Sequence, residues 1–371
     1  MTRDRFVSAT YLLTSVGDFL ESVTFRMLAD GMLLQDIRLA ATSVRSWEGW
    51  PAFWMNVSSV HEGHADEALR YATRQTTASH LLRSSLCAHY AQFMAFDMPE
   101  PKARAAIAKI ELFRRASSLL EPAAELIGIP FDGATLPAYL RVPGGIKPTP
   151  VVVLVGGLDA TKEDAHQMAD LCLQRGCAVL AFDGPGQGEA YVDGLRFSPD
   201  SPRAIGAVLD HIETRAELDA SRVGVLGRSL GGNLAARAAA EDPRIAACVV
   251  WGGPYDLGNL DAKPPLIQAG YQFITGLEDW SDAKALLAGV TVAGSSRSIT
   301  CPLLIVQGTL DNSVPVTQAQ RLAAEVPQST LWLFEGSIHC CHDVAHVVRP
   351  AMVDWLVGRL TAPTFPAGST A

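Results

Sequence analysis

Short apolar runs alternate with longer helix-like segments from Val151 onward, and this pattern constrains the fold more than any other feature of the chain. The runs predict strands at residues 151–155, 178–182, 222–226, 245–251, 303–307 and 330–334. Strands that are apolar on both faces are typical of a parallel sheet buried between two layers of helices. We therefore expect an α/β fold with a mostly parallel sheet and helices on both of its faces.

The first 120 or so residues differ, because they show no alternating strand pattern and are rich in Ala, Leu, Met and Arg. This pattern predicts helices, among them segments at about 66–96 and 100–120. After Glu121-Pro122 the helical pattern ends. Two short strands joined by a turn at Asp132-Gly133 are predicted before the parallel sheet. We expect a helical N-terminal domain, an α/β domain and a flexible tail, at residues 1–120, 121–361 and 362–371.

The N-terminal end carries arginines before a weakly apolar stretch at 6–16, which invites comparison with a secretory signal. Hydroxyl side chains interrupt the stretch, and no small-residue cleavage site follows it. Leu12, Val16 and Leu20 recur at helical spacing, so we predict an amphipathic helix instead.

The chain is acidic, with 30 Lys and Arg against 39 Asp and Glu among 371 residues. This balance lacks the basic patch of a nucleic-acid-binding protein and would be repelled by anionic lipid headgroups. No apolar run approaches the roughly 18 residues that span a bilayer. The seven cysteines lie mostly in apolar surroundings, as reduced packing residues do. We expect a cytoplasmic protein that binds a small molecule, and neither nucleic acid nor membranes.

The sequence Gly227-Arg228-Ser229-Leu230-Gly231 is the strongest local signal. It fits the pattern G-x-S-x-G and lies between a predicted strand and an alanine-rich helix, where a nucleophile elbow places a reactive serine. Small neighbours let the strand and helix approach closely, and the helix N-terminus favours developing negative charge. An ordinary Gly-rich turn is the alternative, but the flanking strand and helix favour Ser229 as a nucleophile.

A nucleophilic serine needs a base, and the base needs an acid that orients it. In this architecture the acid and then the histidine follow the serine along the chain. Asp311 and His339 fit this order, and each follows a predicted strand. Asp256 and His342 are the alternatives. The small-residue turn and Val-Pro around Asp311 favour it, whereas His342 begins a helix, where capping or packing is expected.

Two backbone N–H groups are expected to hold an oxyanion beside the serine. One belongs to Leu230, the residue after the serine, and the other to the loop Gly156-Gly157-Leu158-Asp159, with Leu158 preferred over Gly157. The Gly-rich stretch at 183–188 lacks the lysine of a phosphate-binding loop. We interpret it as a structural turn.

Potential metal ligands surround the expected base in the sequence His339-Cys340-Cys341-His342 and at His346. The glutamate of H-E-x-x-H is missing, and the chain has no C-x-x-C pair. We therefore expect no metal site and no cofactor.

Together these residues carry a resemblance to the α/β-hydrolase superfamily. Within it, the chain resembles the branch of 2,6-dihydroxypseudooxynicotine hydrolase and the fermentation–respiration switch-type serine hydrolases. The most specific stretches are Gly-Gly-Leu-Asp-Ala-Thr-Lys-Glu at 156–163 and His-Cys-Cys-His at 339–342. The resemblance implies an α/β-hydrolase core, an N-terminal helical cap that recognises the substrate, and a homodimer.

The resemblance also implies a reaction, the cleavage of a carbon–carbon bond next to a ketone through an acyl-enzyme, in a β-diketone or acyl-aromatic substrate. It further implies that Asp159 assists, with a helix N-cap as the alternative role. A carboxylesterase or thioesterase, or an acyltransferase or cyclase, is the alternative reading of the same triad. Intact Ser229, Asp311 and His339 argue against a non-catalytic binding protein.

Four aromatic residues of the helical segment, Trp50, Trp54, Tyr90 and Phe93, are candidate substrate-binding residues. Packing in a core is the commoner fate of such side chains.

Overall fold

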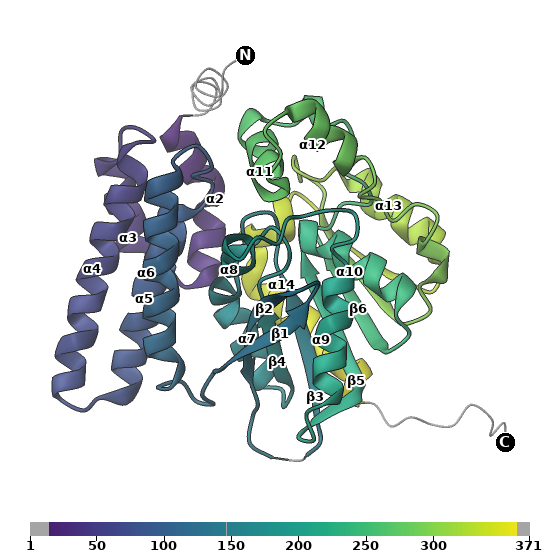
Figure 1. The fold of residues 1–371 in the computed structure, drawn as a ribbon, viewed down its shortest axis with the longest axis horizontal. Helices are drawn as coiled ribbons and strands as arrows, with labels where there is room; N and C mark the ends of the chain where they lie inside the picture. Colours follow the sequence, from purple (N-terminus) through teal and green to yellow (C-terminus); the bar gives the residue numbers. More distant parts are fainter. Residues whose placement is uncertain (1–14, 146, 362–371) are drawn as a thin grey trace.

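The computed structural model describes residues 15–145 and 147–361, which form two adjoining regions (Figure 1). A bundle of helices lies on one side, and an α/β region with a central sheet lies on the other. The expected tail at 362–371 and the part of the expected amphipathic helix at 6–14 lie outside the described residues.

Within the described residues, the helical region contains five helices, with α4, α5 and α6 packed side by side along their lengths. The helices are α2 (Val16–Asp30), α3 (Leu34–Ser43), α4 (Gly49–Arg70), α5 (Arg74–Gln92) and α6 (Pro99–Ser117). The helical segment predicted at 66–96 is divided between two helices, because the chain turns between α4 and α5 at Ala72, which has φ of 55°. Neither glycine nor proline marks this turn, so the helical spacing continues through it.

The α/β region is built on an eight-stranded sheet in the order β1-β2-β4-β3-β5-β6-β7-β8. The strands are β1 (Glu125–Phe131), β2 (Ala134–Arg141), β3 (Thr149–Val155), β4 (Ala178–Phe182), β5 (Leu218–Arg228), β6 (Ile245–Trp251), β7 (Leu303–Gly308) and β8 (Thr330–Phe334). β1 and β2 form an antiparallel hairpin, and β2 is antiparallel to β4. The remaining pairs are parallel, which confirms the expected α/β fold.

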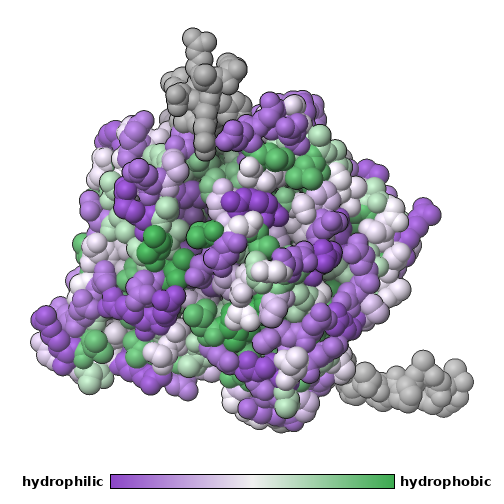
Figure 2. Space-filling model, in the orientation of Figure 1, coloured by the Kyte–Doolittle hydropathy of each residue, from purple (hydrophilic) through white to green (hydrophobic). Residues whose placement is uncertain are grey.

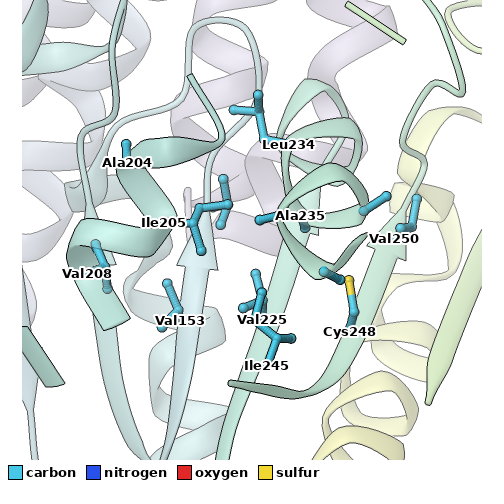
Figure 3. Packing of buried hydrophobic residues seen from close by; sticks show 14 of the residues in the cluster. Val153, Ala204, Ile205, Val208, Val225, Leu234, Ala235, Ile245, Cys248 and Val250 are labelled. Atoms are coloured by element: carbon cyan, nitrogen blue, oxygen red, sulfur yellow. The ribbon is translucent and has the colours of Figure 1, made fainter. Parts of the chain in front are cut away.

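Helices cover both faces of this sheet. The helices of the α/β region are α7 (His166–Leu173), α8 (Gly188–Val192), α9 (Arg203–Glu213), α10 (Leu230–Glu241), α11 (Pro265–Thr275), α12 (Trp280–Leu287), α13 (Val316–Glu325) and α14 (Ala345–Thr361). Alternate residues of β3 face opposite layers, because side chains of a strand alternate. Val153 belongs to the apolar cluster with α9 and α10, and Val152 to the cluster with α7 and α14. Figure 3 shows the first cluster, with Ile205 of α9 and Ala235 of α10 beside Val153 and the neighbouring strands.

The segment between β6 and β7 interrupts the alternation of strands and helices, and it contains α11 and α12. α11 packs against the helical region, since Leu266 and Ile267 contact the apolar core of that region. A Cβ on Gly270 would lie 2.8 Å from a ring carbon of Phe96 and 2.9 Å from a methyl carbon of Leu158. α11 therefore brings the helical region close to the loop that follows β3.

The surface is mixed in character. On the face in Figure 2, hydrophobic residues lie in small groups among hydrophilic ones. Within residues 15–145 and 147–361, no helix is both long and apolar enough to cross a lipid bilayer.

Candidate active site

Ser229 lies in the turn between β5 and α10, with φ of 55° and ψ of −124°. This conformation is strained for a residue that carries a side chain. A Cβ on Gly227 would lie 2.1 Å from the Gly231 carbonyl oxygen, and one on Gly231 would lie 2.3 Å from the Val155 carbonyl oxygen. The Ser229 N–H donates to the Trp251 carbonyl at 2.8 Å. Close packing of β3, β5, β6 and α10 therefore requires the glycines and fixes the serine.

Ser229, His339 and Asp311 form a hydrogen-bonded chain. His339 Nε2 lies 2.9 Å from Ser229 Oγ, and His339 Nδ1 lies 2.7 Å from Asp311 Oδ2. Asp311 Oδ1 accepts two backbone N–H groups of its own turn at 2.8 Å, and the Gln307 amide donates to Asp311 Oδ2 at 2.8 Å. Every oxygen of the acid is therefore held in place.

Two loops at the same edge of the sheet bring the acid and the base together. Asp311 follows β7, and His339 begins the 3₁₀ turn η4 (His339–Val344) after β8. A Cβ on Gly308 would lie 2.3 Å from the Ser337 carbonyl oxygen. Only glycine at position 308 lets these two loops come this close.

The electrostatics of the pair favour proton transfer from the serine. Burial alone would raise the pKa of Asp311, but hydrogen bonds from His339, Val314 and Gln307 hold that pKa below its ordinary value. Burial acts to lower the pKa of His339, but Cys340 and Asp311 outweigh it and raise that pKa above its ordinary value. The ionised acid thus makes the histidine a stronger base.

The alternative acid and base lie elsewhere. Asp256 forms an ion pair with Arg321 at 3.4 Å. His342 is buried with its ring 5.4 Å from that of Trp251, and burial holds its pKa well below the ordinary value. Of the candidates, the structure brings Asp311 and His339 to Ser229.

The loop after β3 lies against the serine. A Cβ on Gly157 would lie 3.2 Å from Ser229 Cβ and 3.7 Å from Ser229 Oγ. Leu230 is the first residue of α10, and a helix leaves the N–H groups of its first turn without intrahelical partners. Gly157 and Leu230 thus lie beside Ser229, where the sequence predicts oxyanion donors.

Asp159 lies at the boundary with the helical region. Its carboxylate oxygens are 2.9 Å and 3.0 Å from Lys102 Nζ of α6, and one of them accepts the Met94 N–H at 2.5 Å. Thr161, rather than Asp159, precedes the 3₁₀ turn η1 (Lys162–Ala165), and no side chain caps that turn. The cap interpretation of Asp159 is therefore wrong. Sequence reasoning missed Lys102, because nothing near it in the chain marks its partner.

The four candidate aromatic residues pack inside the helical region. Trp50, Trp54 and Tyr90 are fully buried, and Phe93 is nearly so. The Trp50 indole N–H donates to the Tyr90 carbonyl at 2.7 Å. All four belong to one apolar cluster, which agrees with the packing alternative.

Buried charged side chains connect the helical region to the residue that precedes Ser229 in the elbow. Arg228, which precedes the serine, donates to Asp164 at 2.7 Å, and Arg26 of α2 donates to the same carboxylate at 3.0 Å. Asp30 of α2 accepts a hydrogen bond from Arg349 at 2.7 Å. Burial would raise the pKa of both aspartates, but the arginines hold both values below the ordinary range. The sequence gives no local signal for this network.

Two sets of described side chains place potential metal-ligating atoms within 4.8 Å of one another. They are Asp36 with His61 and Cys87, and Glu163 with Asp183 and Glu189. In the first set the carboxylate and the imidazole already share a hydrogen bond of 2.8 Å. In the second, the Lys162 ammonium pairs with the carboxylates. Both sets are accounted for by contacts within the protein.

An elbow after a central strand, whose acid and base come from later strands of the same parallel sheet, is the arrangement that defines the α/β hydrolases. Comparison with known proteins narrows this class. The chain matches the esterase FrsA-like family over residues 39–259 and the dienelactone hydrolase family over residues 192–346. A 2,6-dihydropseudooxynicotine hydrolase of Paenarthrobacter nicotinovorans is 35% identical over 347 residues, which cover 91% of this chain and 93% of the relative. The chain therefore belongs to the FrsA-like esterase family of α/β hydrolases.

Solved structures and fungal relatives agree with this assignment. The crystal structure of a 2,6-dihydroxy-pseudo-oxynicotine hydrolase superposes with a TM-score of 0.85 at 34% identity, over 91% of this chain and 96% of that chain. Hydrolase LUC6 of a Fusarium species is 36% identical over 60% of this chain. The match covers 57% of the fungal protein, so this chain spans little more than half of that relative.

Proposed function

We propose that this protein is a serine hydrolase that cleaves a carbon–carbon bond next to a ketone. The observation that carries the proposal is the hydrogen-bonded chain from Ser229 through His339 to Asp311. The bond type is supported by the similarity, over nearly the whole length, to a hydrolase of 2,6-dihydropseudooxynicotine.

In the proposed reaction, Ser229 Oγ attacks the carbonyl carbon while His339 Nε2 takes its proton. The N–H groups of Leu230 and of Leu158 or Gly157 stabilise the oxyanion. When the oxyanion collapses, the carbon–carbon bond breaks, and its electron pair leaves on a carbon that is delocalised as an enolate or an electron-rich ring. His339 returns its proton to that carbon. Water, activated by His339, then hydrolyses the acyl-enzyme.

For Asp159 we propose a positioning role in this reaction. Both of its oxygens already accept hydrogen bonds, from Lys102 and from the Met94 N–H. Because both oxygens are engaged as hydrogen-bond acceptors, we assign this carboxylate no proton transfer to the leaving group. It instead ties the oxyanion loop to the helical region.

The helical region, we propose, covers the site and recognises the substrate together with α11, whose Gly270 lies against Phe96 and Leu158. A homodimer is proposed from the family resemblance alone. A cytoplasmic location is supported by the seven cysteines, which are all free thiols.

Ester hydrolysis is the second candidate function. It is favoured by the matches to an esterase family and to the dienelactone hydrolase family. The enzyme would then be a carboxylesterase or thioesterase, or an acyltransferase or cyclase that passes the acyl group to another nucleophile.

The test replaces the nucleophile and compares two substrates. Ser229→Ala should lower turnover of both 1-phenyl-1,3-butanedione and p-nitrophenyl acetate by about 10⁴-fold or more, because the triad acts as a unit. Ser221→Ala, on an exposed serine of β5, is the matched control and should leave both rates unchanged. A Ser229→Ala enzyme that kept a tenth of the wild-type rate would show that Ser229 is not the nucleophile. A wild-type enzyme that hydrolysed the ester and left the diketone intact would favour the second candidate.

A further inference from the structure

We propose, on the basis of the function proposed above, that Gln187 is a positioning residue that sets the direction of the two candidate oxyanion donors in the loop after β3, the N–H groups of Gly157 and Leu158. Gln187 lies in the Gly-rich turn between β4 and α8 and is almost completely buried. Its amide nitrogen donates to the Gly156 carbonyl at 3.0 Å and to the Gly157 carbonyl at 2.7 Å. One side chain therefore holds two successive peptide groups of the loop.

The orientation of the Gln187 amide is itself fixed. Its oxygen accepts the Gly184 N–H at 3.0 Å, so the NH₂ group faces the loop. The glycines on either side of Gln187 allow this close fit. A Cβ on Gly186 would lie 2.8 Å from Phe197 Cβ, and one on Gly188 would lie 2.2 Å from a carboxylate oxygen of Asp183.

Peptide planarity carries the effect of Gln187 to the donors. In a trans peptide the N–H points away from the carbonyl of the same peptide group. A Gly156 carbonyl that faces Gln187 therefore turns the Gly157 N–H away from Gln187. The Gly157 carbonyl does the same for the Leu158 N–H. Both donors are left free for a ligand bound at Ser229, which Gly157 contacts.

The loop needs such a restraint because it contains two successive glycines. Glycine adopts almost any backbone conformation, so a flip of either peptide costs little by itself. A flip would point a carbonyl oxygen, rather than an N–H, at the developing oxyanion. The Ala160 N–H also bonds to the Gly157 carbonyl, at the longer distance of 3.3 Å. Gln187 adds a bond to each carbonyl and so opposes both flips.

The test uses two variants that differ in what they remove. Gln187→Glu keeps the side-chain length and an oxygen for the Gly184 N–H, but it replaces the NH₂ group with an oxygen that repels both carbonyls. Gln187→Met removes the three side-chain hydrogen bonds, to Gly184, Gly156 and Gly157, without adding a charge. Gln328→Glu is the matched control, because Gln328 also donates to a backbone carbonyl, that of Ile299, far from the site.

The readouts are kcat and KM for p-nitrophenyl acetate and the inhibition constant of 2,2,2-trifluoroacetophenone, whose adduct with a serine carries an oxyanion. Both Gln187 variants should lower kcat on the order of 100-fold, the usual effect of a misplacement of about 1 Å. KM should change by less than about 3-fold, and the inhibitor should bind more weakly by the same factor as kcat, because the interaction is made in the transition state.

A variant that melted at a lower temperature but kept its kcat and its affinity for the inhibitor would overturn the proposal, since Gln187 would then only stabilise the turn. If Gln187→Glu fails to fold, Gln187→Met decides by the same readouts. Ser229→Ala separates this proposal from the proposed function. Full activity in Ser229→Ala would refute the function, whereas an inactive Ser229→Ala beside active Gln187 variants would refute the role of Gln187 alone.

Discussion

The two regions of the molecule are held in place by different forces. The α/β region is built from paired strands between two apolar layers, and the triad stands on strand ends. The helical region has its own apolar core, and buried ion pairs join it to the α/β region in addition to apolar contacts such as those of Leu266 and Ile267. These pairs are Arg26 with Asp164, Asp30 with Arg349, Lys102 with Asp159, and Lys109 with Glu163.

The difference means that the triad and the helical region around it are positioned by different interactions. Apolar contact is non-directional, so the sheet derives its precision from backbone hydrogen bonds. A buried ion pair is stable only while both partners are present in good geometry. The helical region is therefore docked in one arrangement. Its charged side chains pair with residues of the loop after β3 and, through Asp164, with Arg228 of the elbow.

The largest effect on stability is expected when the carboxylate of Asp164, which Arg228 and Arg26 share, is removed. Asp164→Ala removes the shorter carboxylate contact of both Arg228 and Arg26 and leaves them only Asp30, at 3.7 Å and 3.3 Å. It should lower the free energy of unfolding by about 3–5 kcal/mol. Urea unfolding followed by circular dichroism measures this. Asp354→Ala, at an exposed ion pair of α14, is the control. A loss below about 1 kcal/mol would mean that apolar contacts alone dock the helical region.

A smaller effect is expected on activity when the boundary is changed beside the oxyanion loop. Asp159→Asn weakens the bond to Lys102 and should slow 1-phenyl-1,3-butanedione and p-nitrophenyl acetate turnover by the same factor, about 10-fold or more, since both reactions use the oxyanion donors. Rates for the two substrates are measured on one preparation. A loss confined to the diketone would instead make Asp159 the proton donor for the leaving carbon.

Acid should weaken the boundary gradually through its buried histidines. Burial lowers the pKa of His89 to about 3, and it lowers that of His342 well below the ordinary value of 6.5. Below pH 6.5 the unfolded chain binds protons that the folded protein does not. Stability should therefore fall as pH drops from 6.5 towards 3, by up to about 1.4 kcal/mol per pH unit for each histidine. Urea unfolding between pH 7 and pH 5 measures the slope. His89→Gln should reduce this slope, and an unchanged slope in that variant would show that His89 does not cause the loss of stability in acid.

The smallest effect is expected at an ion pair on the surface. Arg203 and Asp132 lie 3.0 Å apart with their side chains 59% and 47% exposed. Arg203→Ala should change the free energy of unfolding by less than about 1 kcal/mol, because solvent screens the pair. The same urea experiment measures this. A loss as large as that of Asp164→Ala would end the distinction between buried and exposed pairs in this protein.

The features that the sequence predicts are those whose cause is local. Each strand of the parallel sheet is a run of apolar residues, and Ser229, Asp311 and His339 each follow such a run. Their meeting is then a consequence of topology, since the ends of parallel strands share one edge of the sheet. Gly227 could be recognised for the same reason, because its close contact is with Gly231 of the elbow itself.

The features that the sequence does not predict depend on partners far away in the chain. Lys102 is 57 residues from Asp159, and Arg26 is 138 residues from Asp164. Gln187 stands in a turn whose glycines suggest only a tight bend. The sequence makes Trp50 and Trp54 candidates for substrate binding, but they pack in a core, because the sequence does not distinguish an aromatic residue of a pocket from one of a core.

Arg349 has a consequence for how this family can acquire new specificities. This residue of the last helix binds the Ala29 carbonyl as well as the Asp30 carboxylate, and so it holds the end of α2. A chimera whose bundle lacked Arg26 and Asp30 would leave Arg349 without its carboxylate and Asp164 without one of its two arginines. An exchange of the bundle therefore requires matching charges in the α/β region, and a new substrate range gained in this way needs substitutions on both sides of the boundary.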